Sequence, residues 1–185
     1  MTLFIDVQVD IETGGTQPDR TPILQIAAVP FNLKEMAISP DVFCQSLHIP
    51  PHRMWDESTR RWWGEQKPEI LEDIVSKMRP PADVMNEFFS YACNLGPNLR
   101  FWAKPTSFDF PFIAGYFRDF ELPNPFHYRL ARDVNSWIDA RYYPEPPPKI
   151  ETSAETTHNA LDDCYQQIEL LFRHYANTRP SCPQT

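Results

Sequence analysis

The sequence predicts an α/β protein in which a mixed five-stranded sheet is flanked by helices. Three apolar, β-prone runs lie near the N-terminus, at 3–11, 23–29 and 41–49, and short links join them as in an antiparallel meander. Strand-like and helix-like segments alternate later in the chain, which is typical of parallel crossovers added to such a meander. The chain has 185 residues, 42% of them apolar, and can bury one sizeable core. We therefore expect a single domain over 1–178 and a short tail at 179–185.

Glycines and prolines separate the elements of the N-terminal half. They place a turn over 13–21 and end the meander at Pro50-Pro51. A first helix is expected over 56–63, where acids come first and bases later, as the helix dipole favours. Pro68 opens a second helix through about residue 78. A third helix follows, in which five apolar residues keep helical spacing: Val84, Phe88, Phe89, Ala92 and Leu95.

The C-terminal half alternates between strands and helices. We expect a strand, a turn, a helix, a strand and a helix, in that order, at 99–103, 105–111, 112–120, 126–131 and 133–141. The proline-rich stretch 142–157 is most simply a loop. A last helix follows, and its apolar face is formed by Leu161, Cys164, Ile168, Leu171 and Tyr175.

Charge and cysteine usage narrow the class of protein. A net charge of −8 argues against nucleic-acid binding by bulk electrostatics, so contact with a polyanion would have to be local and metal-assisted. The four cysteines form no C-x-x-C pair and are expected to be reduced, intracellular thiols. The N-terminus has no basic segment of a signal peptide, and no apolar run approaches membrane-spanning length. We expect a soluble, cytoplasmic protein without a membrane partner.

Two carboxylates stand close together in the first strand, in Val9-Asp10-Ile11-Glu12-Thr13. Alternate residues of a strand share a face, so Asp10 and Glu12 project together, which is costly unless a cation or a proton lies between them. Carboxylate oxygens are hard ligands suited to Mg²⁺ or Mn²⁺. Two such ions, about 3.5–4 Å apart, can clamp both the attacking and the leaving oxygen of a phosphodiester. If these acids stood alone, a strand end with two solvated acids would be the simpler interpretation.

Further acidic segments accompany this pair. Asp109 lies in Ser107-Phe108-Asp109-Phe110-Pro111, and Asp163 follows His158 by five residues in His158-Asn159-Ala160-Leu161-Asp162-Asp163. This order, D-x-E, then D, then H-x-x-x-x-D, resembles the DEDDh family of 3′-to-5′ exonucleases, which have a ribonuclease H-like fold. The segment around Phe108, Trp62-Trp63-x-x-Gln66 and Arg132-Asp133 together resemble the branch that holds phage-type exonuclease A and the bacterial exoribonuclease-like proteins. The resemblance covers about residues 3–175.

The resemblance implies a role for each acidic position and for the histidine. Asp10, Glu12, Asp109 and Asp163 would hold two Mg²⁺ or Mn²⁺ ions, with Asp10 bridging them and Asp109 holding metal-bound water. His158 would sit on the loop that enters the last helix and take a proton from the attacking water. Its alternative is a surface histidine near a helix N-cap. Asp162 is one residue short of the family spacing and is expected to be an exposed first-turn acid.

The residues that would contact the substrate are less directly indicated by the sequence than the metal ligands. By the same resemblance Thr13, Gly14, Trp63, Gln66 and Phe108 are expected to contact the substrate. Gly14 departs from the family, because a bulky apolar residue that wedges the terminal base usually follows D-x-E-T. Trp62 and Trp63 could stack a base or belong to the core. Arg132 and Asp133 could support the metal site or form a simple ion pair, and four cations in expected loops could touch phosphates or be solvated: Arg20, Lys104, Arg141 and Lys149.

The function expected from the sequence is a metal-dependent 3′-to-5′ exonuclease. It would hydrolyse the terminal phosphodiester of single-stranded nucleic acid, RNA slightly favoured over DNA, and release a nucleoside 5′-monophosphate. One alternative is a phosphodiesterase acting on short oligonucleotides or capped ends, which an acidic protein with few phosphate contacts would suit. Another is a catalytically silent module that binds nucleic acid or protein. Members of the family often form homodimers, but the sequence identifies no interface.

Overall fold

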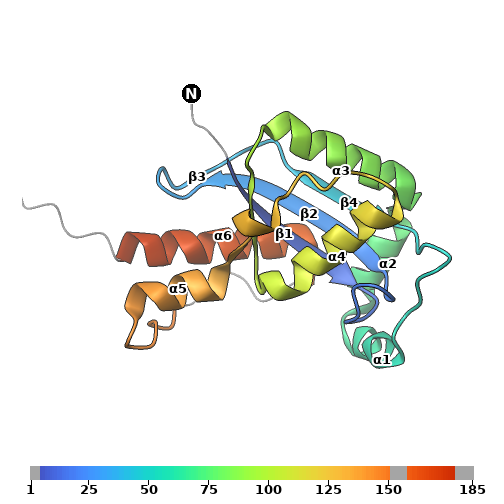
Figure 1. Ribbon diagram of the computed structural model, residues 1–185. Coiled ribbons are helices and arrows are strands. Elements are labelled where there is room, and N and C mark those ends of the chain that lie inside the picture. The colour runs from blue at the N-terminus through green and yellow to red at the C-terminus, as the bar shows by residue number, and fades with distance from the viewer. Residues whose placement is uncertain (1–4, 151–157, 178–185) are drawn as a thin grey trace, which may run out of the picture.

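The computed structural model describes residues 5–150 and 158–177, which form a mixed sheet covered by helices (Figure 1). The sheet has seven strands in the order β5-β4-β2-β1-β6-β7, with β3 paired to β2. The strands are β1 Asp6–Thr13, β2 Ile23–Asn32, β3 Ala37–Ile38, β4 Phe43–Leu47, β5 Met78–Arg79, β6 Arg100–Ala103 and β7 Arg132–Asp133. The helices are α1 Glu57–Glu65, α2 Pro68–Ser76, α3 Pro81–Leu95, α4 Thr106–Asp119, α5 Val134–Tyr142 and α6 Ala160–Asn177, with a 3₁₀ turn at Tyr128–Leu130.

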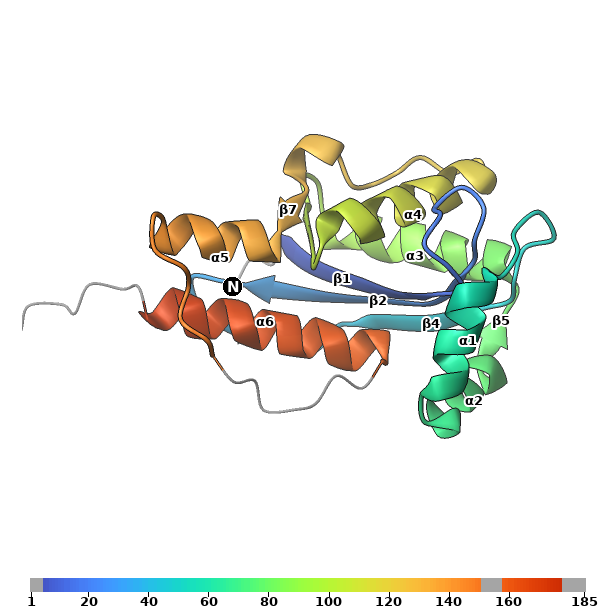
Figure 2. The same ribbon diagram turned by 90° about the horizontal axis from the view of Figure 1, so that it is seen from below.

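Helices cover both faces of the sheet. Figure 2 shows α3 and α4 above the sheet, α6 below it, and α1 and α2 beyond one end. One core cluster joins α3 and α4 to Val7, Val9 and Ile11 of β1. A second cluster joins α5 and α6 to Ala27 and Val29 of β2. The α/β class, the antiparallel meander of β1, β2 and β4, and the parallel additions β6 and β7 confirm the expected fold.

The pairing of β1 changes along its length. It pairs with β2 from Asp6 to Thr13, so the strand runs through the acidic pair instead of ending there. On its other side it pairs with β6 only from Asp6 to Gln8. The second half of β1 therefore has one edge that β6 leaves open, and this is the part of the strand that carries Asp10 and Glu12.

The prediction of a turn at 105–111 was wrong, because α4 already begins at Thr106. Pro105 offers no side-chain cap, but the Oδ2 of Asp133 accepts a hydrogen bond from the Thr106 N–H at 2.9 Å. Pro111 lies inside the helix, where the only intrahelical bond that it removes is the one to the carbonyl of exposed Ser107 in the first turn. A cap from a residue distant in the sequence thus starts the helix where local signals indicated a turn.

The fifth strand expected at 126–131 was also misplaced. That segment contains the 3₁₀ turn, in which the Nδ1 of His127 accepts a hydrogen bond from the Arg129 N–H. The strand that pairs with β6 is β7, immediately afterwards. The sequence also missed β3 and β5, which have two residues each and are too short to show a periodicity.

Other expected elements differ only at their ends. The first helix has its N-cap at Asp56, the second ends at Ser76, and the third begins at Pro81. Parts of the expected loop at 142–157 and the tail at 179–185 lie outside the described residues. Within the described ranges, no helix is both long and apolar enough to cross a bilayer.

Candidate active site

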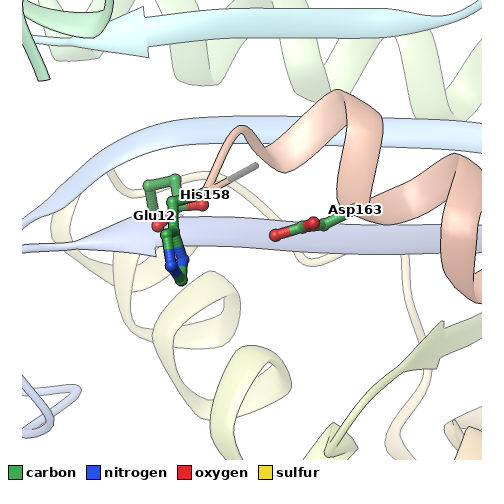
Figure 3. A group of neighbouring side chains, drawn as sticks. All are labelled: Glu12, His158 and Asp163. Atoms are coloured by element: carbon green, nitrogen blue, oxygen red, sulfur yellow. The ribbon is translucent and has the colours of Figure 1, made fainter. Parts of the chain in front are cut away.

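Three of the expected site residues meet at the end of β1 where α6 begins. Glu12 comes from β1, His158 from the segment entering α6 and Asp163 from the first turn of α6 (Figure 3). One potential ligand atom of each residue lies within 4.8 Å of the others. The structure therefore brings Glu12 together with His158 and Asp163, which lie near the other end of the sequence.

Asp10 and Asp109 complete the acidic cluster. The charges of Asp109, Glu12 and Asp163 all act on Asp10, so the four carboxylates are electrostatic neighbours. Asp109 is only 3% exposed and sits in the first turn of α4. Its carboxylate accepts hydrogen bonds from its own N–H and from that of Ile11, on the stretch of β1 that β6 leaves open. The early end of β6 thus gives α4 access to the edge of β1.

Burial and like charge both oppose ionisation of these acids. Burial, then the charges of Asp109, Glu12 and Asp163, raise the pKa of Asp10 well above its usual value. Burial together with Asp163 and Asp109 raises the pKa of Glu12 to about 8, and burial raises that of Asp109 to about 8. In the described part of the chain, none of these three acids forms an ion pair with a lysine or arginine. A cluster of oxygen ligands with this unmet charge fits a divalent cation.

Asp133 positions Asp109 indirectly by capping α4. Its Oδ2 accepts from the Thr106 N–H, and its Oδ1 accepts from the Ser136 N–H at 2.8 Å, so one carboxylate caps both α4 and α5. Burial favours the neutral acid, but these backbone donors outweigh it and hold the pKa of Asp133 below its usual value. Of the two expected roles for this residue, support of the site is the one that the contacts favour.

Aromatic rings surround His158. The centroid of the Trp62 ring lies 4.8 Å from that of the imidazole and that of Trp63 lies 6.5 Å away, both edge-to-face. His158 has a φ of +50°, a left-handed conformation that is uncommon for a residue other than glycine. Just beyond it, the Ala160 N–H donates to the Oε1 of Gln25 at 2.9 Å, which ties the start of α6 to β2. Gln25 is the residue of β2 that pairs with Glu12.

Two of the residues expected to contact substrate line a pocket between α1 and α2. Trp63 and Gln66 contribute to its wall, and its volume is about 430 Å³; the other lining residues are Arg60, Gly64, Pro68, Leu71, Glu72 and Val75. Trp63 is otherwise buried, and its Nε1–H donates to the Thr13 carbonyl at 3.0 Å. It therefore connects the end of β1 to this pocket, whereas Trp62 is 38% exposed.

Gly14 is enclosed and cannot take the place of the family's apolar wedge. A Cβ there would lie 2.7 Å from the Cγ of Pro22 and 3.1 Å from the Cδ2 of Trp55. The Thr13 hydroxyl donates to the Gly15 carbonyl at 2.7 Å, so it is engaged within the same turn. Phe108, half-buried, packs against Phe112 with ring centroids 5.1 Å apart. Gly14 and Thr13 are therefore held within the turn that follows β1, and Phe108 packs within α4.

Other sequence candidates lie outside the cluster. Asp162 is exposed, as expected. The Arg141 guanidinium lies over the Trp137 ring, 4.4 Å from its centroid. The Nη1 of Arg132 donates to the carbonyls of Arg129 and Ala131, in place of the expected ion pair.

Sequence reasoning missed three buried or half-buried glutamines beside the acids. Gln8 precedes Asp10 by two residues, Gln167 follows Asp163 by four, and Gln25 faces Glu12 across the strand pair. The first two spacings place a side chain on the same strand or helix face as an acid, and this signal could have found them. The pairing of Gln25 with Glu12 depends on sheet register and had no such signal.

Comparisons with known proteins match most of the chain. The model of the 3′-5′ exoribonuclease Rv2179c-like domain matches residues 5–173. The exodeoxyribonuclease of Enterobacteria phage T4 is 23% identical over 200 residues, which cover 91% of this chain and 88% of that protein.

Solved structures of exonuclease I share the fold. One matches with a TM-score of 0.69 and 17% identity, over 93% of this chain and 42% of that one. A zinc-bound E. coli exonuclease I with single-stranded DNA matches with a TM-score of 0.69 and 18% identity, over 90% of this chain and 39% of that one. This chain thus spans about two fifths of the exonuclease I chains.

The family match covers both ends of the acidic cluster, from the strand of Asp10 and Glu12 to the helix of Asp163. The same span holds the ribonuclease H-like sheet shared with exonuclease I. The chain therefore belongs to the 3′-5′ exoribonuclease Rv2179c-like family and is a DEDDh-type 3′-to-5′ exonuclease.

Proposed function

We propose that this protein uses divalent cations to hydrolyse the 3′-terminal phosphodiester of single-stranded nucleic acid, releasing a nucleoside 5′-monophosphate. The observation that carries the proposal is the convergence of four carboxylates and one histidine at the edge of β1 that β6 leaves open, where Asp10, Glu12 and Asp109 form no ion pair with a lysine or arginine of the described residues. We extend the proposal to one domain over 1–178, since the family match runs through most of that range.

Asp10, Glu12, Asp109 and Asp163 would hold Mg²⁺ or Mn²⁺. Their oxygen donors suit these hard cations, and the raised pKa values of Glu12 and Asp109 indicate that a positive charge is needed for all of them to ionise near neutral pH. When bound, such ions supply charge neutralisation to the phosphate and the leaving oxygen. An E. coli exonuclease I of the same fold has been crystallised in a zinc-bound form, which supports a metal ion as cofactor.

His158 is the proposed general base. It lies beside Glu12 and Asp163 at the mouth of the cluster, where its imidazole can take a proton from the attacking water. The edge-to-face contact with Trp62 limits how far the ring can swing, while the partial exposure of Trp62 leaves room for a base to reach the indole. We therefore propose that Trp62 contacts the substrate, in addition to the residues that the sequence predicted to do so.

We propose a substrate strand that enters along α1. Trp63 and Gln66 line the pocket beside the site, and the exposed Trp62 can stack a base without reading its identity. Exonuclease I has been crystallised with dT13, which is consistent with single-stranded substrates in this fold. The matched family is described as an exoribonuclease, which supports RNA as substrate, whereas the T4 relative is an exodeoxyribonuclease, which supports DNA. Activity must therefore be compared on RNA and on DNA.

The test uses 5′-labelled single-stranded RNA and DNA of equal length with Mg²⁺ or Mn²⁺. We expect a ladder that shortens from the 3′ end, disappears with EDTA, and slows by about 10²–10⁴-fold in His158→Ala. His48→Ala is the matched control, because His48 is exposed and lies at the end of β4. An undiminished rate with EDTA or in His158→Ala would overturn the proposal.

A dinucleotide substrate tests the second candidate. The net charge of −8 favours a short substrate footprint over a long electrostatic track. A rate on the dinucleotide far above that on a long strand would identify the protein as a phosphodiesterase of short oligonucleotides.

A further inference from the structure

A chain of two glutamines ends on Asp10. The Nε2 of Gln167, on α6, donates to the Oδ1 of Asp10 at 2.7 Å. The Nε2 of Gln8, on β1, donates to the Oε1 of Gln167 at 2.6 Å. The three side chains therefore form one hydrogen-bonded file between the sheet and α6, leading from the core to the acidic cluster.

The carboxylate fixes the direction of this file. With a cation bound, Asp10 is ionised and can only accept, so Gln167 presents its NH₂ group to Asp10 and its oxygen to Gln8, as the contacts show. Gln8 must then present its own NH₂ group to Gln167. As a result the Oε1 of Gln8 is buried and has no hydrogen-bond partner among the described residues.

An unpartnered amide oxygen makes Gln8 an unfavourable choice for the core. Gln8 is 0% exposed, and the Cys164 Sγ–H donates to its backbone carbonyl oxygen at 3.6 Å, not to the side-chain Oε1. A buried acceptor without a partner destabilises the fold, whereas an apolar residue of similar size would carry no such penalty. Fold stability alone therefore does not account for a glutamine here, but the orientation of Gln167 does.

We propose that Gln167 is a positioning residue for the metal site. It donates to Oδ1 of Asp10 and so restrains the carboxylate, whose Oδ2 would be available to bind a cation, while Gln8 holds Gln167 in turn. α6 thus carries both Asp163 and, one helical turn later, the amide that orients Asp10. The inference rests on the proposed function, because it assumes a cation among these acids.

The test measures Mn²⁺ binding by the rise in melting temperature and by calorimetry, in the full chain. Gln167→Met keeps the size of the side chain and removes the donor. We expect it to weaken Mn²⁺ binding by about 10–100-fold, as for other groups that orient a metal ligand, and to lower kcat with little change in KM for the substrate. Gln8→Met acts one step further away and should weaken Mn²⁺ binding by less, about 3–10-fold.

Gln45→Met is the matched control. Gln45 is a half-buried glutamine on β4 that accepts a hydrogen bond from Arg79, away from the cluster. The Gln45→Met variant should reach half-saturation at the same Mn²⁺ concentration as the wild type, even if its metal-free melting temperature falls.

The outcomes separate the two proposals. If the wild-type protein shows no response to Mn²⁺, the proposed function fails. If the wild type responds and Gln167→Met responds at the same Mn²⁺ concentration, only the positioning role is overturned. Should Gln167→Met fail to fold, an unchanged Mn²⁺ midpoint in Gln8→Met would overturn the role, and a weaker one would support it.

Discussion

The carboxylates at the two ends of β1 differ in whether a positively charged side chain pairs with them. At its start, Asp6 is 3% exposed and is fully engaged: the Arg100 Nη2 lies 2.5 Å from its Oδ2, and the Trp102 Nε1–H donates to its Oδ1 at 2.6 Å. At its end, Asp10 and Glu12 face further acids, and no lysine or arginine of the described residues pairs with either. Strand, face and residue type are similar, yet only one end is neutralised by the chain itself.

This difference distinguishes a structural acid from a functional one. Asp6 receives its positive partner from β6, the strand that pairs with the first half of β1. Where β6 stops, the edge of β1 is filled by α4 and Asp109, which adds another negative charge. A stable fold with such a cluster is consistent with a cation bound from solution. Substitutions at each end of β1 test this difference.

The largest effect is expected for activity at the functional end. Asp10→Asn keeps the shape of the side chain but removes the charge that the proposed metal site needs, so we expect exonuclease activity to fall by about 10³-fold or more. Asp6→Asn is the matched variant on the same strand. It should retain activity within a few-fold and lose stability of about 1–2 kcal/mol, because Arg100 is partly exposed and its unpaired charge stays hydrated. Equal losses of activity in both variants would contradict the division of roles.

The second effect is the pH dependence of stability without metal. In the folded state the pKa values of Glu12 and Asp109 are raised to about 8, so these groups keep their protons to higher pH than in the unfolded chain. The folded state then binds more protons, and stability is full below the unfolded pKa and decreases as pH rises from about 4.5 to 8. With EDTA we expect the melting temperature to fall by roughly 5–10 °C across that range. Scanning calorimetry should show a smaller fall in Glu12→Gln and in wild type with Mn²⁺; a rise with pH would refute raised carboxyl pKa values as the cause.

The smallest effect is expected at Asp133, a half-buried acid whose carboxylate accepts hydrogen bonds from backbone N–H groups. Asp133→Ala removes one N-cap from α4 and one from α5, each of which is typically worth about 1 kcal/mol. We expect the free energy of unfolding in urea to drop by about 2 kcal/mol, with a partial loss of activity since α4 carries Asp109. Asp139→Ala, at an exposed position of α5, is the control. An unchanged free energy of unfolding would show that the caps are replaced by water.

Local periodicity explains how much of the site could be read from the sequence. Asp10 and Glu12 share a face because the side-chain period of a strand is two residues, whatever the rest of the chain does. Helical spacing likewise predicted the apolar face of α6 and placed His158 just before it. The alternation of strand-like and helix-like segments predicted the fold class, and the order of the acidic segments predicted the family; both are confirmed.

What the sequence could not predict depends on where distant segments meet. The start of α4 is set by Asp133, 27 residues later, and local signals therefore indicated a turn. Gly14 lies against Pro22 and Trp55, contacts that arise only when the turn folds back on itself and on the segment before α1. The file from Gln8 through Gln167 to Asp10 likewise spans 159 positions in the sequence.

The sequence by itself determined which chemistry the protein can perform, because residue type and short-range spacing fix the ligands and their shared faces. Tertiary structure alone decided which acids are neutralised. That outcome follows from a single topological fact, the end of the β1–β6 pairing at Gln8, which places Arg100 beside Asp6 and leaves Asp10 among carboxylates. Pairing of this kind is a property of strands far apart in the chain, and no local pattern encodes it.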